Sequence, residues 1–405
     1  MSMPLPSSDD AVGGTEAPRS FTELGVSRKV ANALRFRGIE SPFPIQSVVI
    51  PDALARRDVL ARSRTGSGKT LAFAVPIVER LTPGRRPHAL ILAPTRELAS
   101  QVTEEFRAIV DVRRLSVAPV YGGVGVTPQA KKARTADIVV ATPGRLLDLV
   151  ARRLIRLDDV QIAVLDEADR MLDMGFLPDV TRILDLLPRD RQTMLFSATL
   201  DGEVGRLART ITRDPVRHEI GDGRLSVSDA VHRFVPVAHA EKMRTVVREL
   251  AADRGLTLIF VRTQRGADRL ARNLRKQGFG AGELHGGMSQ PQRERALGRF
   301  ASGARDVLVA TDVAARGLDL DGITHVINFD APADEKAYVH RVGRTARAGR
   351  SGDAVTFVTP EQHVEVAKIA ERLSLVSGLR GEREHRSGAR RGSHPRRRVR
   401  PARSR

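Results

Sequence analysis

Residues 63–70 read Ser63-Arg64-Thr65-Gly66-Ser67-Gly68-Lys69-Thr70 and stand between the apolar residues Val59–Ala61 and a stretch with helical spacing. Small residues let backbone N–H groups wrap around a phosphate, and the following helix directs its positive end there. In this pattern Lys69 reaches the β and γ phosphates, and Thr70 offers a hydroxyl to Mg²⁺. Ser63 replaces the usual first glycine. A plain glycine-rich turn is the alternative, but the order strand, loop, helix predicts a nucleotide site formed by Thr65, Gly66, Ser67, Gly68, Lys69 and Thr70.

A cluster of carboxylates supplies the expected partner of this loop. Asp166-Glu167-Ala168-Asp169 directly follows the apolar run Ile162–Leu165. Ligands of parallel sheets bind beyond the carboxyl ends of the strands. We expect Asp166 to hold Mg²⁺ and Glu167 to polarise an attacking water. Alone, such a tetrapeptide is more often a solvated loop or a helix cap, and only its combination with the phosphate loop favours nucleotide hydrolysis.

Short apolar runs alternate with helical patterns through most of the chain. Continuous apolar runs are typical of strands buried on both faces of a parallel sheet. Helical stretches such as Ala99–Val110 and Ala267–Lys276 separate them, and this alternation indicates βαβ units. The 405 residues exceed one ordinary core, so we predict two α/β domains. The runs are Ala89–Ala93, Ile138–Ala141, Ile162–Leu165, Met194–Phe196, Leu256–Val261, Val307–Ala310, His325–Phe329 and Ala354–Val358.

Composition marks the boundaries. Residues 1–20 are rich in Ser, Pro and Gly and are expected to be a disordered lead. The alternation weakens between about residues 214 and 229, where we place a linker at 216–228. This leaves domains at 21–215 and 229–375. The arginine-rich end, 376–405, cannot bury a core and is expected to be a disordered tail, whose arginines suit phosphates; a solvated tail with no role is the alternative.

The charge balance narrows the class of partner. Lys and Arg number 67 against 48 Asp and Glu, a formal net charge of +19, which favours nucleic acid or an acidic membrane surface. The absence of cysteine excludes disulfides and thiolate metal sites. No apolar run approaches the ~20 residues that a membrane span needs. No signal peptide is recognisable at the N-terminus, so a cytoplasmic protein is expected.

These motifs together resemble the DEAD-box RNA helicases of the second helicase superfamily, over about Phe21 to Leu373. The resemblance implies two tandem RecA-like domains, each a mostly parallel sheet flanked by helices, that hydrolyse ATP between them in response to RNA. Further segments agree with the family in order: Pro94–Ala99, Gly122-Gly123, Thr142–Arg145, Ser197–Thr199, His285-Gly286, Gln290 with Arg293, Ala310–Asp312, Arg316–Asp319 and His340–Arg347.

The segment Gly38–Gln46, with Phe21 upstream, resembles the family's adenine-sensing motif. The Gln46 amide offers a donor and an acceptor that match the N6/N7 edge of adenine, so the resemblance implies ATP rather than GTP. Ile39 replaces the common aromatic residue and Phe43 the common threonine. These departures bear on adenine stacking and helix capping.

The second domain is implied to complete the catalytic set. The resemblance assigns Arg344 and Arg347 as arginine fingers and puts Gly317 and Asp319 near the nucleotide. A planar guanidinium stabilises the negative charge that spreads over a transferring phosphoryl group. Ala346 stands where the family usually has glycine, but the two arginines keep their spacing.

The resemblance also implies a coupling element and an RNA surface. The coupling residues are Asp169, Ser197, Thr199 and His340. The RNA candidates are Thr95, Arg96, Gly123, Thr142, Arg145, Gln290, Arg293 and Thr311. These side chains suit phosphate and 2′-OH contacts and include no aromatic platform, so binding of single strands and short duplexes should not depend on base sequence.

Three other functions remain open from sequence. A DNA helicase or translocase would share the phosphate loop and the arginine fingers, although the Gln46 segment argues against it. An RNA clamp or assembly scaffold would use ATP mainly to grip. A membrane-surface protein is disfavoured because no basic amphipathic helix stands out. The RNA target stays undetermined, with ribosomal and RNA-decay assemblies as candidates, and a monomer is expected.

Overall fold

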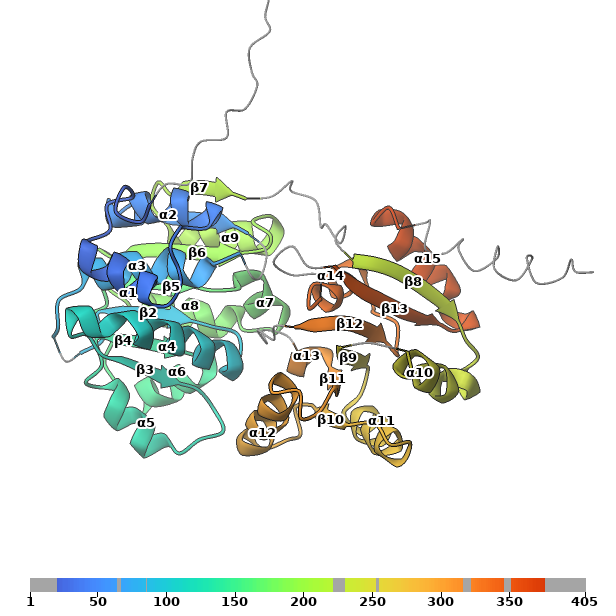
Figure 1. Ribbon diagram of the computed structural model, residues 1–405. Coiled ribbons are helices and arrows are strands. Elements are labelled where there is room, and N and C mark those ends of the chain that lie inside the picture. Colours follow the sequence, from blue (N-terminus) through green and yellow to red (C-terminus); the bar gives the residue numbers. More distant parts are fainter. Residues whose placement is uncertain are drawn as a thin grey trace, which may run out of the picture. The chain divides into compact units, whose positions relative to one another are not determined.

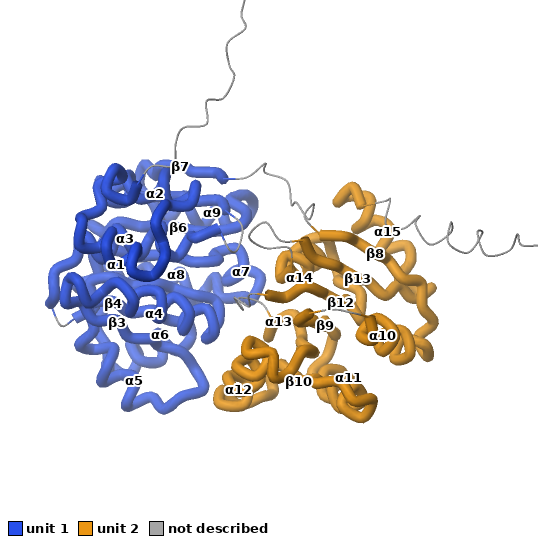
Figure 2. The backbone as a smooth tube through the Cα atoms, viewed as in Figure 1, with its two compact units in different colours: residues 1–223 blue, residues 224–405 orange. Residues whose placement is uncertain are grey.

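The computed structural model describes residues 20–63, 67–84, 86–220, 230–252, 255–315, 322–345 and 351–375. The chain divides between residues 223 and 224 into two compact units (Figure 2). Each unit is a parallel sheet with helices on both faces (Figure 1). The predicted class of two tandem RecA-like α/β domains is therefore confirmed. Among the described residues, none of the helices combines the length and apolar character needed to cross a bilayer.

The sheet of the first unit has seven strands in the order β3-β4-β2-β5-β6-β1-β7, and neighbouring strands pair in parallel. β2, β4, β5 and β6 are buried along their whole length, as continuous apolar runs predict. The strands are β1 (Val59–Arg62), β2 (Ala89–Leu92), β3 (Val117–Val120), β4 (Ile138–Ala141), β5 (Ile162–Leu165), β6 (Gln192–Ser197) and β7 (Val216–Glu219).

Helices cover both faces of this sheet and form two cores. Alternate strand residues point to opposite faces, so Ile91 joins one core and Leu90 the other. On the Ile91 face lie α1 (Arg28–Phe36), α2 (Pro44–Leu54), α3 (Lys69–Arg80) and α4 (Arg96–Val110), the last followed by η1 (Asp111–Arg113). On the Leu90 face lie α5 (Val126–Ala133), α6 (Pro143–Ala151), α7 (Ala168–Asp173), α8 (Leu177–Asp185) and α9 (Gly202–Ile211).

The start of the expected linker needs correction. Residues 216–219 form β7, which pairs in parallel with β1 and so belongs to the first sheet. Its side chains alternate between half-buried and exposed, because it is an edge strand, and it therefore lacks a continuous apolar run. Residues 221–229 lie outside the described residues, as do residues 1–19 and the tail from 376.

The second unit repeats this plan with six parallel strands in the order β10-β11-β9-β12-β13-β8. β9 and β11 are almost entirely buried and occupy the interior of the sheet. The strands are β8 (Ala230–Pro236), β9 (Leu256–Val261), β10 (Ala281–Leu284), β11 (Val307–Thr311), β12 (Ile323–Asn328) and β13 (Gly352–Val358).

Its helices again divide between two faces. On one face of the sheet, Ile259 packs with α10 (Lys242–Leu250), which follows η2 (His239–Glu241), and with α11 (Gln264–Lys276). Leu258 points to the other face of the sheet. The elements on that side are α12 (Gln290–Ala301), α13 (Asp312–Ala315), α14 (Glu335–Val342) and α15 (His363–Arg372), which follows η3 (Pro360–Gln362).

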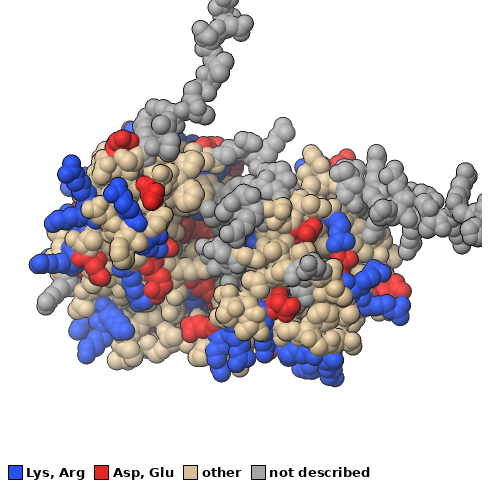
Figure 3. Space-filling model, viewed as in Figure 1, with Lys and Arg blue, Asp and Glu red and all other residues tan. Residues whose placement is uncertain are grey.

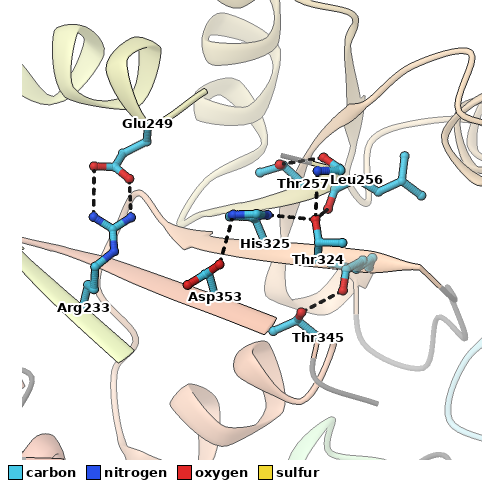
Figure 4. Close-up of polar contacts among 10 residues, drawn as sticks. Arg233, Glu249, Leu256, Thr257, Thr324, His325, Thr345 and Asp353 are labelled. Atoms are coloured by element: carbon cyan, nitrogen blue, oxygen red, sulfur yellow. Dashed lines mark hydrogen bonds and ion pairs between the residues drawn. The ribbon is translucent and has the colours of Figure 1, made fainter. Parts of the chain in front are cut away.

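Polar contacts anchor the end of α14 to the start of β12 (Figure 4). The Thr345 hydroxyl donates to the carbonyl of Ile323 at 2.7 Å, and Thr345 is 2% exposed. Beside it, His325 Nδ1 lies 2.8 Å from the Thr324 hydroxyl and Nε2 lies 3.2 Å from Asp353 Oδ2. These contacts fix the chain next to Arg344.

Candidate active site and RNA surface

The phosphate loop closes on itself around Ser63. Ser63 N–H donates to the carbonyl of Ser197 at 3.1 Å, and its hydroxyl hydrogen-bonds with that of Ser67. Lys69 is buried and its Nζ donates to the Ser63 carbonyl at 3.0 Å. The serine in place of the usual glycine is thus part of the loop's own bonding. Thr65 and Gly66 lie outside the described residues.

Gly68 is required where the loop meets α3. Its φ is +84°, in the left-handed region. A Cβ there would come within 2.5 Å of Gln46 Nε2 and 2.7 Å of Phe43 Cδ2. The ring of Phe43 therefore lies on the phosphate loop, and its side chain is 54% exposed.

Gln46 links α2 to the phosphate loop. The residue is fully buried, its Oε1 accepts from Phe43 N–H at 2.9 Å, and its Nε2 donates to the Gly68 carbonyl at 2.9 Å. Sequence reasoning missed this link, because it joins residues 22 positions apart. An amide keeps one further N–H and one lone pair, so adenine recognition by Gln46 stays a prediction.

The nucleotide contact expected of Phe21 stays a prediction, and the structure gives the surroundings of this residue. Its ring is 3% exposed and packs with Leu24 and Val26 in the first core. Burial of such a ring is worth about 1.5–3 kcal/mol. Phe21 therefore holds the segment before α1 in place.

Asp166 lies at the carboxyl end of β5, where its N–H donates to the Leu92 carbonyl at 2.9 Å. The residue is 2% exposed, and Oδ1 has no hydrogen-bond partner among the described residues. Burial raises the pKa of this carboxyl to about 7, although the charge of Lys69 opposes the rise. A buried carboxylate with a free oxygen is stabilised by a cation.

These oxygens fit Mg²⁺. The Asp166 carboxylate and the Thr70 hydroxyl are hard ligands, and Mg²⁺ is usually held by one or two carboxylates together with substrate phosphates. No cluster of three or more His, Cys, Asp or Glu residues suited to a metal occurs in the described ranges. The residues present therefore suit an ion shared with a nucleotide.

Glu167 is held in an uncommon conformation. Its φ is +51°, and it starts α7 from the left-handed region. Such backbone is found disproportionately at functional sites. Arg170 Nη1 donates to Glu167 Oε2 at 2.7 Å, with side-chain exposures of 4% and 9%. Sequence reasoning missed Arg170, although its i+3 spacing on a helix was a usable signal.

The structure brings together three of the four expected coupling residues. Ser197 Oγ accepts from the N–H groups of Asp169 at 3.2 Å and Thr199 at 3.3 Å. Asp169 Oδ2 in turn accepts from Ala198 N–H at 3.2 Å. His340 belongs to α14 of the second unit, where its carbonyl accepts from Arg344 Nε at 3.3 Å.

The RNA candidates of the first unit follow the carboxyl ends of β2, β3 and β4. Gly123 has a φ of +83°, and the Arg96 guanidinium occupies the place that a Cβ there would take. A Cβ on Gly122 would lie 3.3 Å from the same group. The two glycines therefore make room for Arg96.

Two threonines begin the neighbouring helices. Thr95 is the N-cap of α4 and its hydroxyl accepts from Leu98 N–H at 3.3 Å, while Thr142 is the N-cap of α6. Arg145, in the first turn of α6, donates through Nη1 to the Val124 carbonyl at 3.0 Å. Thr95, Arg96, Gly123, Thr142 and Arg145 thus share one edge of the sheet, where helix N-termini favour phosphate.

Three RNA candidates of the second unit are largely buried. Arg293 is 8% exposed and donates through Nη1 to the His285 carbonyl at 3.2 Å. Thr311 ends β11 and is 7% exposed. Gln290 begins α12; its Nε2 donates to Glu294 Oε1 at 3.1 Å, while Oε1 has no hydrogen-bond partner among the described residues.

Arg344 is 6% exposed. Three residues before it, Arg341 forms an ion pair with Asp312 that sequence reasoning missed. Arg341 donates to both oxygens of Asp312, through Nε at 2.6 Å and Nη2 at 2.7 Å. This pair joins α14 to α13, directly after Thr311. Gly317, Asp319 and Arg347 lie outside the described residues.

Known proteins are similar to this chain in sequence and in fold. The family model for DEAD/DEAH box helicase matches residues 43–207, and the one for helicase conserved C-terminal domain matches residues 241–349. The DEAD-box ATP-dependent RNA helicase CshA of Bacillus subtilis is 43% identical over 346 residues, 85% of this chain and 70% of that protein. S. cerevisiae Dbp5 bound to RNA and ADP BeF3 matches with a TM-score of 0.80 and 31% identity, over 88% of this chain and 94% of that one. Mss116p bound to ssRNA and AMP-PNP matches with a TM-score of 0.80 and 28% identity, over 89% and 78%.

Proposed function

The chain belongs to the DEAD-box ATP-dependent RNA helicases, and from that premise we propose that its own residues hydrolyse ATP in a cycle stimulated by RNA. The observation that carries the proposal is the buried Asp166 carboxyl, whose free oxygen lies within the electrostatic reach of Lys69. A Mg²⁺–nucleotide complex is the ligand that would complete the site formed by Asp166 and Lys69.

We assign the hydrolytic roles within the first unit as follows. Lys69 and the phosphate loop bind the β and γ phosphates, and Asp166 and Thr70 hold Mg²⁺, which when bound neutralises phosphate charge. Glu167 orients the attacking water and accepts its proton. The Arg170 pair supports this assignment, because it holds one Glu167 oxygen in a fixed direction.

The second unit supplies positive charge in this proposal. Arg344 and Arg347 act as arginine fingers on nucleotide held by the first unit, with Gly317 and Asp319 close to it. Fingers of this kind contribute roughly 10³–10⁵ in rate. Hydrolysis would then depend on closure of the two units, which the Asp169, Ser197, Thr199 and His340 contacts would sense.

RNA is proposed to bind through backbone contacts alone. Arg96 and Arg145 suit phosphate, and the two threonine N-caps beside them place helix N-termini at the same edge. Closure on one strand would separate it locally from its complement. Gln290 Oε1, which is buried and has no hydrogen-bond partner among the described residues, suits a donor such as the 2′-OH.

Steady-state ATP hydrolysis with and without single-stranded RNA tests the proposal, with matched DNA and GTP as controls. Stimulation by RNA alone, with ATP preferred, is the expected result. Equal stimulation by DNA would favour a DNA translocase. An absence of hydrolysis under every condition contradicts the catalytic assignment.

An RNA clamp is the second candidate, because the RNA candidates of the second unit are largely buried and Arg293 and Gln290 are held by hydrogen bonds, and such a rigid set also suits gripping. Dissociation of RNA is compared with ATP and with a non-hydrolysable analogue. A helicase releases RNA faster with ATP, whereas a clamp holds it equally long with both.

We also propose that the protein is a monomer and acts on ribosomal or RNA-decay assemblies. Sedimentation velocity would test the oligomeric state, and crosslinking of bound RNA would test the partners.

A further inference from the structure

Helix α11 carries an unusual row of charges. Arg265, Arg269, Arg272 and Lys276 follow one another at i, i+4, i+7 and i+11, and all four are exposed. This spacing puts them on a single stripe of a helix. The buried residues of α11 define the opposite face: Ala267, Leu270, Ala271 and Leu274. Contrary to the expectation from sequence, α11 is thus a basic amphipathic helix, but its apolar face is buried in the core of the second unit. We call the four exposed residues the α11 ridge.

The ridge has no compensating acid. Asp268, the acidic residue of α11, lies with Oδ1 2.9 Å from His285 Nε2. Arg275, which stands off the stripe, donates to Glu283 Oε2 at 2.6 Å. Within the described ranges, no ion pair or hydrogen bond of a ridge side chain is found. Four positive charges therefore face solvent together.

Helix α4 of the first unit shows that this is not the rule for exposed helices here. Like α11, it begins at a threonine N-cap. Its exposed face mixes signs: Arg107 pairs with Glu104, and Glu105 pairs with Arg37. On an ordinary solvated helix face, charges of both signs pair in this way, whereas the α11 ridge carries positive charges alone.

The ridge starts beside the RNA candidates of the second unit. The Gln264 side chain lies against Gly287, where a Cβ would come within 2.7 Å of its Oε1. His285, bonded to Asp268, offers its carbonyl to Arg293. Figure 3 shows Lys and Arg side chains gathered over α11 and α12. The row of charge thus leads away from the loop that precedes Gln290.

We propose that the α11 ridge binds the phosphates of an RNA strand that continues beyond the Gln290 and Arg293 contacts. The ridge is ~16 Å long, from eleven residues at ~1.5 Å each. A stacked strand at ~3.4 Å per nucleotide places about five phosphates along that length. The inference rests on the proposed RNA-coupled function and adds a second, sequence-independent binding surface to it.

The test compares short and long RNA in the full chain. A variant with Arg269→Gln, Arg272→Gln and Lys276→Gln removes three ridge charges and spares Arg265, the residue nearest the RNA candidates. Glutamine has a helix propensity close to that of the residues it replaces. A matched control carries Arg206→Gln, Arg209→Gln and Lys368→Gln, three exposed residues of α9 and α15.

The ridge variant should bind RNA of roughly 25 nucleotides about tenfold or more weakly at low salt, and the slope of log affinity against log salt should fall by about 2. RNA of roughly six nucleotides, which fills only the first contacts, should bind and stimulate hydrolysis as in the unaltered protein. The control variant should keep the affinity and slope of the unaltered protein for both lengths.

Several outcomes overturn the inference. One is an unchanged salt slope for long RNA. Another is an equal loss for short and long RNA, or an equal loss in the control variant. Loss of polyglutamate binding with unchanged RNA binding would reassign the ridge to an acidic protein. If long RNA binds through the ridge but RNA never stimulates hydrolysis, the proposed function fails and the ridge stands.

Discussion

The two units share one architecture but differ in the charges that they bury beside their polar motifs. The first unit buries the carboxylates Asp166, Glu167 and Asp169 together with the cations Lys69 and Arg170, whereas the second buries the guanidinium groups of Arg293, Arg341 and Arg344. A buried carboxylate is stabilised by a cation and a buried guanidinium by an anion or a carbonyl oxygen, so the two units differ in what their buried charges require.

The two sets of charges also differ in how completely they are bonded. Asp166 Oδ1 has no hydrogen-bond partner in the part of the chain that the structure describes, whereas Arg341 donates to Asp312, to Asn328 Oδ1 at 3.2 Å and to the Asp330 carbonyl at 2.6 Å. The first unit therefore carries a site that a ligand completes, and the second a network that completes itself. Substitutions in the first should mainly alter activity, and those around Arg341 mainly stability.

The largest expected effect is on hydrolysis. Glu167→Gln should lower the rate of single-turnover ATP hydrolysis by roughly 10²–10⁴, because a general base is lost while an acceptor for Arg170 remains. Binding of ATP should be retained. Glu203→Gln, on the exposed surface of α9, is the control and should hydrolyse normally. A Glu167→Gln variant with normal turnover would refute the assigned role.

In the second unit, Arg341→Gln should lower the free energy of unfolding by about 3 kcal/mol, because it breaks a buried ion pair. Urea denaturation measures this. Arg152→Gln removes an exposed pair with Asp148 and should cost less than about 0.5 kcal/mol. Equal effects of the two substitutions would mean that the self-bonded network contributes nothing special.

The free carboxyl of the first unit predicts a pH dependence of stability. The Asp166 pKa of about 7 lies above its ordinary value of 3.8, so its stabilising contribution is present below about pH 4 and lost as the pH rises through about 7. Without Mg²⁺, Asp166→Asn should therefore be more stable than the unaltered protein by up to about 4 kcal/mol in mildly alkaline buffer. Thermal unfolding across pH tests this, and a difference that stays constant with pH would contradict it.

The smallest effect concerns two helix starts. Phe43 is the N-cap of α2 and Ser289 is the N-cap of α12. In both, the backbone N–H of the N-cap donates to the side-chain oxygen of the glutamine three residues later, at 2.9 and 2.8 Å. Only Ser289 adds a hydroxyl. Phe43→Ser should stabilise the first unit by about 0.5–1 kcal/mol, measured by urea denaturation. A loss of stability would show that the ring on Gly68 matters more than the missing cap.

How far the sequence predicts the sheets depends on strand position. The eight apolar runs all coincide with strands, namely β2, β4, β5, β6, β9, β11, β12 and β13. Five strands match none of these eight runs: β1, where the apolar residues Val59–Ala61 precede the phosphate loop, and β3, β7, β8 and β10, which are the four edge strands. An edge strand is covered less completely, so residues such as Arg217 and Glu283 are accepted there. Apolar content therefore detects the middle of a parallel sheet and not its rim.

The sequence by itself determined the phosphate loop, the acidic tetrapeptide and the order of motifs, because these depend on residues that are neighbours in the chain. Tertiary structure alone decided that Phe21 is buried, that Gln46 bonds Gly68, and that Ser197 receives the N–H of Asp169. It also decided which Asp166 oxygen stays free. These features depend on which distant segments the fold brings within hydrogen-bond distance, and no local pattern records that.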